Sequence, residues 1–173
     1  MIQYLTPMVK LIKHEEASKK FKIDLFYTEE NMHYFSMYGD KEVMIFVPRG
    51  YLTDGASVPK SLQTLFPVWD TYYQAAVFHD YLCEYMTIYT RKEMIPIKLS
   101  RTEVDFYFNE LMRRLNTNPF KRKLVHAGVV TYSHFKSIVY PSANADKRYY
   151  EDQIRRQMDE LDLIRENQKN KTA

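Results

Sequence analysis

The chain has 173 residues, of which 45% are hydrophobic and 15% aromatic, and its formal net charge is +3. This length is typical of one domain, and the apolar content is sufficient for a core. A charge of +3 is too small to indicate a nucleic-acid partner. The single cysteine, Cys83, excludes an intrachain disulfide and a cysteine-based zinc cluster. No segment reaches the roughly 20 apolar residues of a transmembrane helix, so we expect none.

The first half of the chain predicts strands. Three apolar or alternating segments lie between turn residues: Phe21–Tyr27, Met32–Tyr38 and Val43–Val47. We therefore expect a small antiparallel sheet over about residues 20–53. The segment that follows, Leu52–Pro59, contains an Asp-Gly turn and predicts a loop.

The second half, about residues 71–165, predicts helices. Two capping-box patterns, Thr71–Gln74 and Ser100–Glu103, begin segments that we expect to be helical to about Tyr85 and Leu115. Apolar spacing and the position of proline predict two more helices, Phe120–Val139 and Asp146–Asn167. The expected fold class is α+β, with a small N-terminal antiparallel sheet followed by three to four helices. Residues 1–165 form a single domain in this interpretation, and 166–173 form a polar tail.

The strongest functional signal lies in the first of these helices. The apolar segment Ala75–Leu82 contains an adjacent imidazole and carboxylate, His79 and Asp80. Burying a charge without a partner costs several kcal/mol, so the pair needs a metal, a carboxylate or a hydrogen-bond network. Consecutive helical residues lie about 100° apart, so these two side chains point in different directions.

Two further carboxylates complete a candidate hydrolytic site. Asp105 lies among apolar residues near the start of the next helix, and antiparallel packing would let it orient His79. His79 would then be the general base, with Asp105 as the second catalytic residue, and Asp80 with Asp54 would hold a divalent cation, calcium or zinc. A purely structural role for these residues is the alternative. Cys83 lies four residues after His79 on the same helical face, and we interpret it as an inert buried thiol rather than the partner of the imidazole.

Three motifs resemble a family of unknown function from tailed phages and prophages, domain of unknown function 1353. They are the loop Thr53–Pro59, the helix Ala75–Leu82 and the segment Arg101–Phe108. The resemblance covers about Val47 to Leu115 and implies a phage or prophage origin. Cys83 departs from the tyrosine that is frequent in the family at this position.

Two enzyme classes show a similar arrangement. Phospholipases of the A-two type carry a His-Asp pair on one helix and an orienting Asp on a second, which His79, Asp80 and Asp105 match in type and order. The glycine-rich calcium loop and the disulfides of those enzymes are missing. HD-type phosphohydrolases need an upstream histidine, for which His14 and His33 are the candidates, and they fit less well.

The sequence thus predicts a phage-encoded accessory protein with a metal-assisted hydrolase site formed by His79, Asp105, Asp80 and Asp54. Two alternatives remain open: a non-catalytic phage protein that binds and inhibits a host factor, and a component of the virion tail. The expected partners are accordingly a host protein or virion proteins, and the last helix is a candidate oligomerisation surface. The expected location is the cytoplasm of the infected bacterial host, or the virion.

Overall fold

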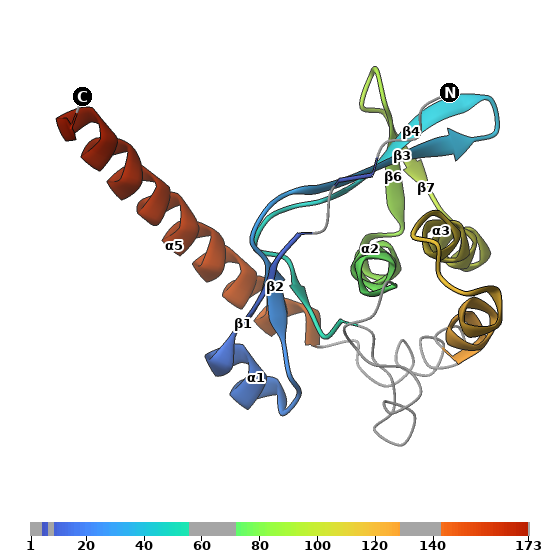
Figure 1. Cartoon of the computed structure of the whole chain (residues 1–173), viewed down its shortest axis with the longest axis horizontal. Coiled ribbons are helices and arrows are strands. Elements are labelled where there is room, and N and C mark those ends of the chain that lie inside the picture. The colour runs from blue at the N-terminus through green and yellow to red at the C-terminus, as the bar shows by residue number, and fades with distance from the viewer. Residues whose placement is uncertain (1–4, 7–8, 56–71, 129–142, 173) are drawn as a thin grey trace.

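The computed structural model of the chain describes residues 5–6, 9–55, 72–128 and 143–172 (Figure 1). The described residues form two antiparallel sheets together with helices, which confirms the α+β class. The expected loop beyond Gly55, the cap at Thr71 and the end of the helix expected over 120–139 lie outside the described residues.

The larger sheet has four strands in the order β3-β4-β6-β7. Strands β3 (Met32–Tyr38) and β4 (Lys41–Val47) form the predicted antiparallel hairpin, and alternate residues of both are buried. Gly39 lies in the turn with a φ of +61°, which glycine adopts without strain. Strands β6 (Thr87–Thr90) and β7 (Pro96–Lys98) follow the first long helix and were not predicted.

The smaller sheet has the order β1-β2-β5 and begins earlier in the chain than expected. Its strands are β1 (Leu11–Lys13), β2 (Phe26–Thr28) and β5 (Leu52–Thr53). The strand expected over residues 21–27 is wrong in its first part, because Phe21 ends helix α1 (Glu15–Phe21). The cap of this helix is the imidazole of His14, which accepts a hydrogen bond from the Ala17 N–H, and histidine is an uncommon signal for a helix start.

Helices α2 (Tyr73–Tyr85) and α3 (Arg101–Arg114) pack together and, with β3 and β4, enclose the main core. The predicted capping box of α3 is confirmed: Ser100 and Glu103 exchange side-chain and backbone hydrogen bonds. The Leu99 N–H donates to the Met86 carbonyl, so α3 begins where α2 ends and the two helices run in opposite directions. Residues 119–128 are also helical.

The last helix, α5 (Ala143–Thr172), packs on strand β5 of the smaller sheet. Tyr150 and Ile154 are buried there against Ala17, Leu25 and Leu52, which form a second core. Figure 1 shows the second half projecting away from both sheets, and it continues past the boundary expected at residue 167. Among the described residues, no helix has the length and apolar character needed to cross a membrane.

Candidate functional site

The contact between α2 and α3 brings together two of the predicted site residues. Nε2 of His79 lies 3.0 Å from Oδ1 of Asp105, and the two residues are only 2% and 7% exposed. The opposite directions of the two helices place them side by side, as the sequence analysis anticipated. Asp105 therefore holds the imidazole through one ring nitrogen.

The charges of this pair follow from its surroundings. Burial lowers the pKa of His79 below its usual value, against the opposing effect of the hydrogen bond with Asp105. Burial raises the pKa of Asp105, but the contact with His79 and the positive charge of Arg101 outweigh this, and the net pKa lies below the usual value. At neutral pH the pair is thus a carboxylate and a neutral imidazole. Because the carboxylate only accepts, Nε2 carries the proton and Nδ1 is the basic nitrogen.

Three other side chains surround the imidazole. Cys83 is one turn along α2, and its Sγ lies 3.6 Å from Nδ1 and 3.5 Å from Nε2 of His79. The Phe108 ring lies against the imidazole with 4.6 Å between centroids. Arg101 Nε lies 3.7 Å from Asp105 Oδ1. Arg101, Asp105 and Phe108 recur at helical spacing, so one face of α3 supplies every α3 residue of this cluster.

His126 is a member of the cluster that the sequence did not predict. It belongs to the helical residues 119–128, and its ring nitrogen Nε2 lies 3.2 Å from the backbone oxygen of Asp105. Its ring stacks on Phe108 with 6.3 Å between centroids. The contact thus joins the backbone of Asp105 to the helical residues 119–128. Nothing in the spacing of residue 126 relative to residue 105 signals this contact.

Asp80 points to a different side of α2 from His79. Its Oδ2 accepts a 2.6 Å hydrogen bond from the Thr53 hydroxyl at the end of β5, and the same hydroxyl accepts from the Gly55 N–H. Asp54, between these two residues, is half-buried. The two predicted cation ligands thus belong to neighbouring segments, on the face of α2 turned away from Asp105.

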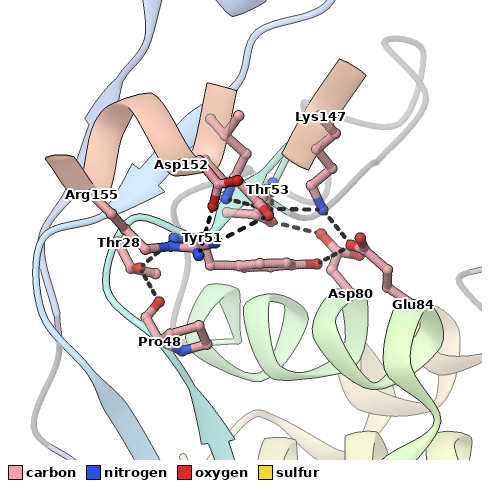
Figure 2. A network of polar contacts seen from close by, with 12 residues as sticks. Thr28, Pro48, Tyr51, Thr53, Asp80, Glu84, Lys147, Asp152 and Arg155 are labelled. Carbon is pink, nitrogen blue, oxygen red and sulfur yellow. Dashed lines mark hydrogen bonds and ion pairs between the residues drawn. The ribbon is translucent and has the colours of Figure 1, made fainter. Parts of the chain in front are cut away.

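This second face of α2 continues into a buried charged network (Figure 2). Glu84, one turn after Asp80, accepts a 2.6 Å bond from Lys147 of α5 and a 3.3 Å bond from the Tyr51 hydroxyl. The Lys147 ammonium lies 4.1 Å from the centre of the Tyr51 ring, a cation–π contact. Burial first, and then the nearby carboxylates, raise the pKa of Tyr51 well above its usual value.

The network ends at Glu151, which is fully buried. Its Oε1 accepts from the Leu52 N–H at 3.0 Å and lies 3.7 Å from the Lys147 ammonium, while Oε2 lies 3.4 Å from Arg155. Burial raises the pKa of Glu151, partly offset by these partners. This carboxylate therefore ties α5 to the edge strand of the smaller sheet.

This network was not predicted from the sequence, although a signal was present. Lys147, Glu151 and Arg155 recur every four residues, a pattern typical of an exposed helix face. Glu151 nevertheless follows Tyr150 directly and so borders the apolar stripe that α5 buries. A charge beside such a stripe is the feature that could have indicated burial.

The described residues contain no group of three or more histidine, cysteine, aspartate and glutamate side chains arranged to hold a metal ion. Asp54 and Asp80 supply two carboxylates, and cation binding by them stays a prediction. Of the upstream histidines proposed for an HD-type site, His14 caps α1 and His33 lies on β3 against the Phe46 ring.

Comparison with known proteins gave one match. The family model described as "Protein of unknown function (DUF1353)" matches residues 30–129. No curated protein and no solved structure matches the chain. The matched region contains His79, Cys83 and Asp105 but ends before α5.

Proposed function

The chain belongs to the family of proteins of unknown function DUF1353, and we propose that it is a hydrolase whose general base is His79. The observation that carries this proposal is the 3.0 Å contact between His79 Nε2 and Asp105 Oδ1 inside the matched region. A neutral imidazole with a fixed tautomer is the form that accepts a proton from a nucleophile. Asp105 is the positioning residue, which orients the ring and stabilises the imidazolium that forms.

The burial of this pair supports acid–base chemistry. A surface His-Asp contact is screened by water and contributes little, whereas here both groups are buried between two helices. Keeping a carboxylate and a histidine in such a place costs free energy that an apolar pair would not cost. The Phe108 ring further restricts the imidazole to one orientation. A polar pair retained at this cost and locked in one geometry is the arrangement expected of a catalytic base.

A divalent cation, calcium or zinc, held by Asp80 and Asp54 is a separate part of the proposal. The Asp80 carboxylate already accepts a short bond from Thr53, and a third ligand is not provided by the described residues. We therefore derive no step through a metal. Equilibrium dialysis against calcium, zinc and manganese, with Asp80→Asn as the comparison, tests this part separately.

The proposed biological setting follows from the resemblance of the motifs. The chain would be a phage-encoded accessory protein that acts in the cytoplasm of the infected bacterium. Mass spectrometry of purified virions tests the alternative location, because a tail component would be recovered with the particles. Absence of this chain from the particles would exclude the tail role.

The hydrolase proposal is tested with chromogenic probes. Wild-type protein is assayed with p-nitrophenyl butyrate and with bis-p-nitrophenyl phosphate, with and without EDTA. His79→Ala is expected to lower the rate for the accepted probe about 10²-fold or more, the range of general base catalysis. Circular dichroism confirms that the variant is folded. If a folded His79→Ala protein keeps the wild-type rate in every assay that the wild type passes, the proposal is wrong.

A second, non-catalytic function is favoured by one observation on α5. Beyond its contact with the sheet, Leu161, Leu163 and Ile164 are 53%, 60% and 47% exposed. Leu161 and Ile164 lie one turn apart on the projecting helix, and exposed apolar side chains at this spacing are typical of a protein-binding surface. The candidate function is binding of one host protein. Recovery of a stoichiometric partner by wild type and not by Leu161→Glu/Ile164→Glu would support it, and equal recovery by both proteins would contradict it.

A further inference from the structure

An apolar stripe on the helical residues 119–128 faces solvent. Phe120, Leu124 and Ala127 follow one another at intervals of four and three residues, so they share one face of the helix. Phe120 is 78% exposed and Leu124 is 46% exposed, and Ala127 is also exposed. An apolar stripe with this spacing is typical of the face that a helix turns toward the core. Here the stripe lies on the outside of the protein.

The other side of the same helix is held against the protein. Val125 is 5% exposed and belongs to the main core. The His126 ring contacts the backbone oxygen of Asp105, and Nζ of Lys121 lies 5.6 Å from the centre of the Tyr72 ring. These contacts fix the rotation of the helix about its axis, so the exposed stripe is a consequence of the packing.

Basic residues accompany the exposed stripe. Residues 111–128 contain no aspartate or glutamate, and their basic residues are Arg113, Arg114, Lys121, Arg122 and Lys123. This segment therefore carries more positive charge than the whole chain, whose formal net charge is +3. Successive helical positions differ by about 100°, so Lys121 and Lys123 border the stripe on its two sides. The exposed surface combines an apolar centre with a cationic border.

We infer that residues 111–128 form a docking surface for a membrane that contains anionic lipids. An amphipathic helix with basic and apolar side chains lies in the plane of the headgroups, and its apolar side chains enter the boundary with the acyl chains. Phe120 and Leu124 are the side chains that enter this boundary. Lysine side chains at the border extend their ammonium groups to the lipid phosphates. This surface is independent of the proposed hydrolase site.

The position of the apolar side chains favours a membrane over a nucleic acid. Binding of nucleic acid depends mainly on cations that contact the phosphates, so the centre of such a surface is cationic. Here Phe120 and Leu124 occupy the centre and project into solvent. A bilayer surface accepts both features, because anionic headgroups attract the basic residues and the acyl chains remove the apolar side chains from water.

Vesicle co-sedimentation of the full-length protein tests the inference. One set of vesicles contains phosphatidylglycerol and phosphatidylcholine in equal parts, and the other contains phosphatidylcholine alone. We expect binding to the anionic vesicles and much weaker binding to the neutral ones. Lys123→Ala should weaken binding to the anionic vesicles about fivefold, the usual contribution of one cation near an anionic surface.

The apolar stripe is tested with a matched pair of double variants. Phe120→Ser/Leu124→Ser is expected to weaken binding to the anionic vesicles about tenfold or more, because it removes the side chains that enter the bilayer. The control is Leu161→Ser/Ile164→Ser, which removes two exposed apolar side chains from α5 and should bind as the wild type does. Circular dichroism confirms that both variants are folded.

Three results would overturn the inference. The first is wild-type protein that does not sediment with anionic vesicles, including the case in which it binds a labelled DNA or RNA oligonucleotide instead. The second is equal binding to neutral and anionic vesicles. The third is an equal loss of binding in the two double variants, which would show that exposed apolar residues act without regard to their position.

Discussion

Helix α2 carries two pairs of polar residues, each with i,i+4 spacing, and the two pairs lie on different faces of the helix. His79 and Cys83 face α3, and Asp80 and Glu84 face β5 and α5. Each pair is spaced by one turn, so a rotation of about 100° separates the His79–Asp105 cluster from the network of Glu84 and Lys147. One helix therefore directs the imidazole of His79 and the carboxylate of Asp80, at adjacent positions, to different partners.

The two faces of α2 differ in where their partner residues lie in the chain. The partner of His79 lies on α3, inside the region that matches the family model. The partner of Glu84 is Lys147 of α5, which lies outside that region. We propose that the face toward α3 carries the chemistry and that the other face attaches the last helix. The following experiments test that division from the largest expected effect to the smallest.

The sharpest test compares one substitution on each face. His79→Asn is expected to reduce hydrolysis of an accepted chromogenic ester 10²- to 10⁴-fold, because it removes the proton acceptor. Glu84→Gln should keep the rate within about twofold, since it alters only the contacts to Tyr51 and Lys147. Steady-state rates at matched folded fractions give the comparison. A folded but inactive Glu84→Gln protein would abolish the proposed division.

The α3 side of this comparison could largely be predicted from sequence. The capping box at Ser100 marks the start of α3, and one polar residue in an apolar helix marks each of His79 and Asp105. Helical periodicity then determined that His79 and Asp80 diverge. These signals are local sequence patterns, so they can be recognised without knowledge of the tertiary contacts.

The other face could not be predicted, because its contacts join distant parts of the chain. Glu151 contacts the Leu52 N–H across 99 residues, and Lys147 contacts Glu84 across 63. The pairing of β6 with β4 is likewise long-range, so the short segment Thr87–Thr90 gave no recognisable strand signal. Helix α1 was missed for a local reason, the uncommon histidine cap.

The next largest effect is expected for Glu151→Ala. This change leaves the Leu52 N–H without its acceptor and removes a buried partner of Lys147 and Arg155, so we expect a loss of about 2–4 kcal/mol in the free energy of unfolding. Urea denaturation measures it. Asp152→Ala is the matched control, since this neighbour is 61% exposed and should change stability by less than about 0.5 kcal/mol. Equal effects at both positions would show that the network does not anchor α5.

A pH dependence of smaller size should accompany this network. Burial raises the pKa of Glu151 above its unfolded value of 4.5, so the folded chain retains a proton that the unfolded chain has lost. This contribution to stability is fully present below pH 4.5 and is lost as pH rises through the folded pKa. The stability of wild type relative to Glu151→Gln should therefore fall as pH increases above 4.5, by about 1.4 kcal/mol for each unit of pKa difference.

The measurement is a pair of urea titrations, one for each protein, repeated between pH 4 and 8. Subtracting the two curves removes the carboxylates whose pKa lies below the usual value, such as Asp105, which contribute in the opposite direction. If the stability difference between wild type and Glu151→Gln stays constant or rises with pH, the partners of Glu151 lower its pKa at least as much as burial raises it.

The smallest effect is expected at the exposed end of the α5 attachment. Arg49 contacts Asp162 at 2.7 Å and Asp159 at 3.2 Å, and both carboxylates are at least 45% exposed. Surface pairs of this kind contribute about 1 kcal/mol or less and weaken with salt. Arg49→Ala should thus leave global stability almost unchanged but increase amide hydrogen exchange in residues 159–172. Arg165→Ala, a more exposed partner of Asp162, is the control and should not change exchange near Asp159.

This last experiment separates two ways of holding one helix. If α5 is attached mainly by Glu151 and Lys147, loss of the Arg49 contacts frees only the projecting half, and exchange near Tyr150 stays slow. If exchange rises along the whole helix, the surface contacts and the buried network act as one cooperative unit. In that case the packing of α5 against α2 depends on the exposed Arg49 contacts as well as on the buried contacts of Glu151 and Lys147.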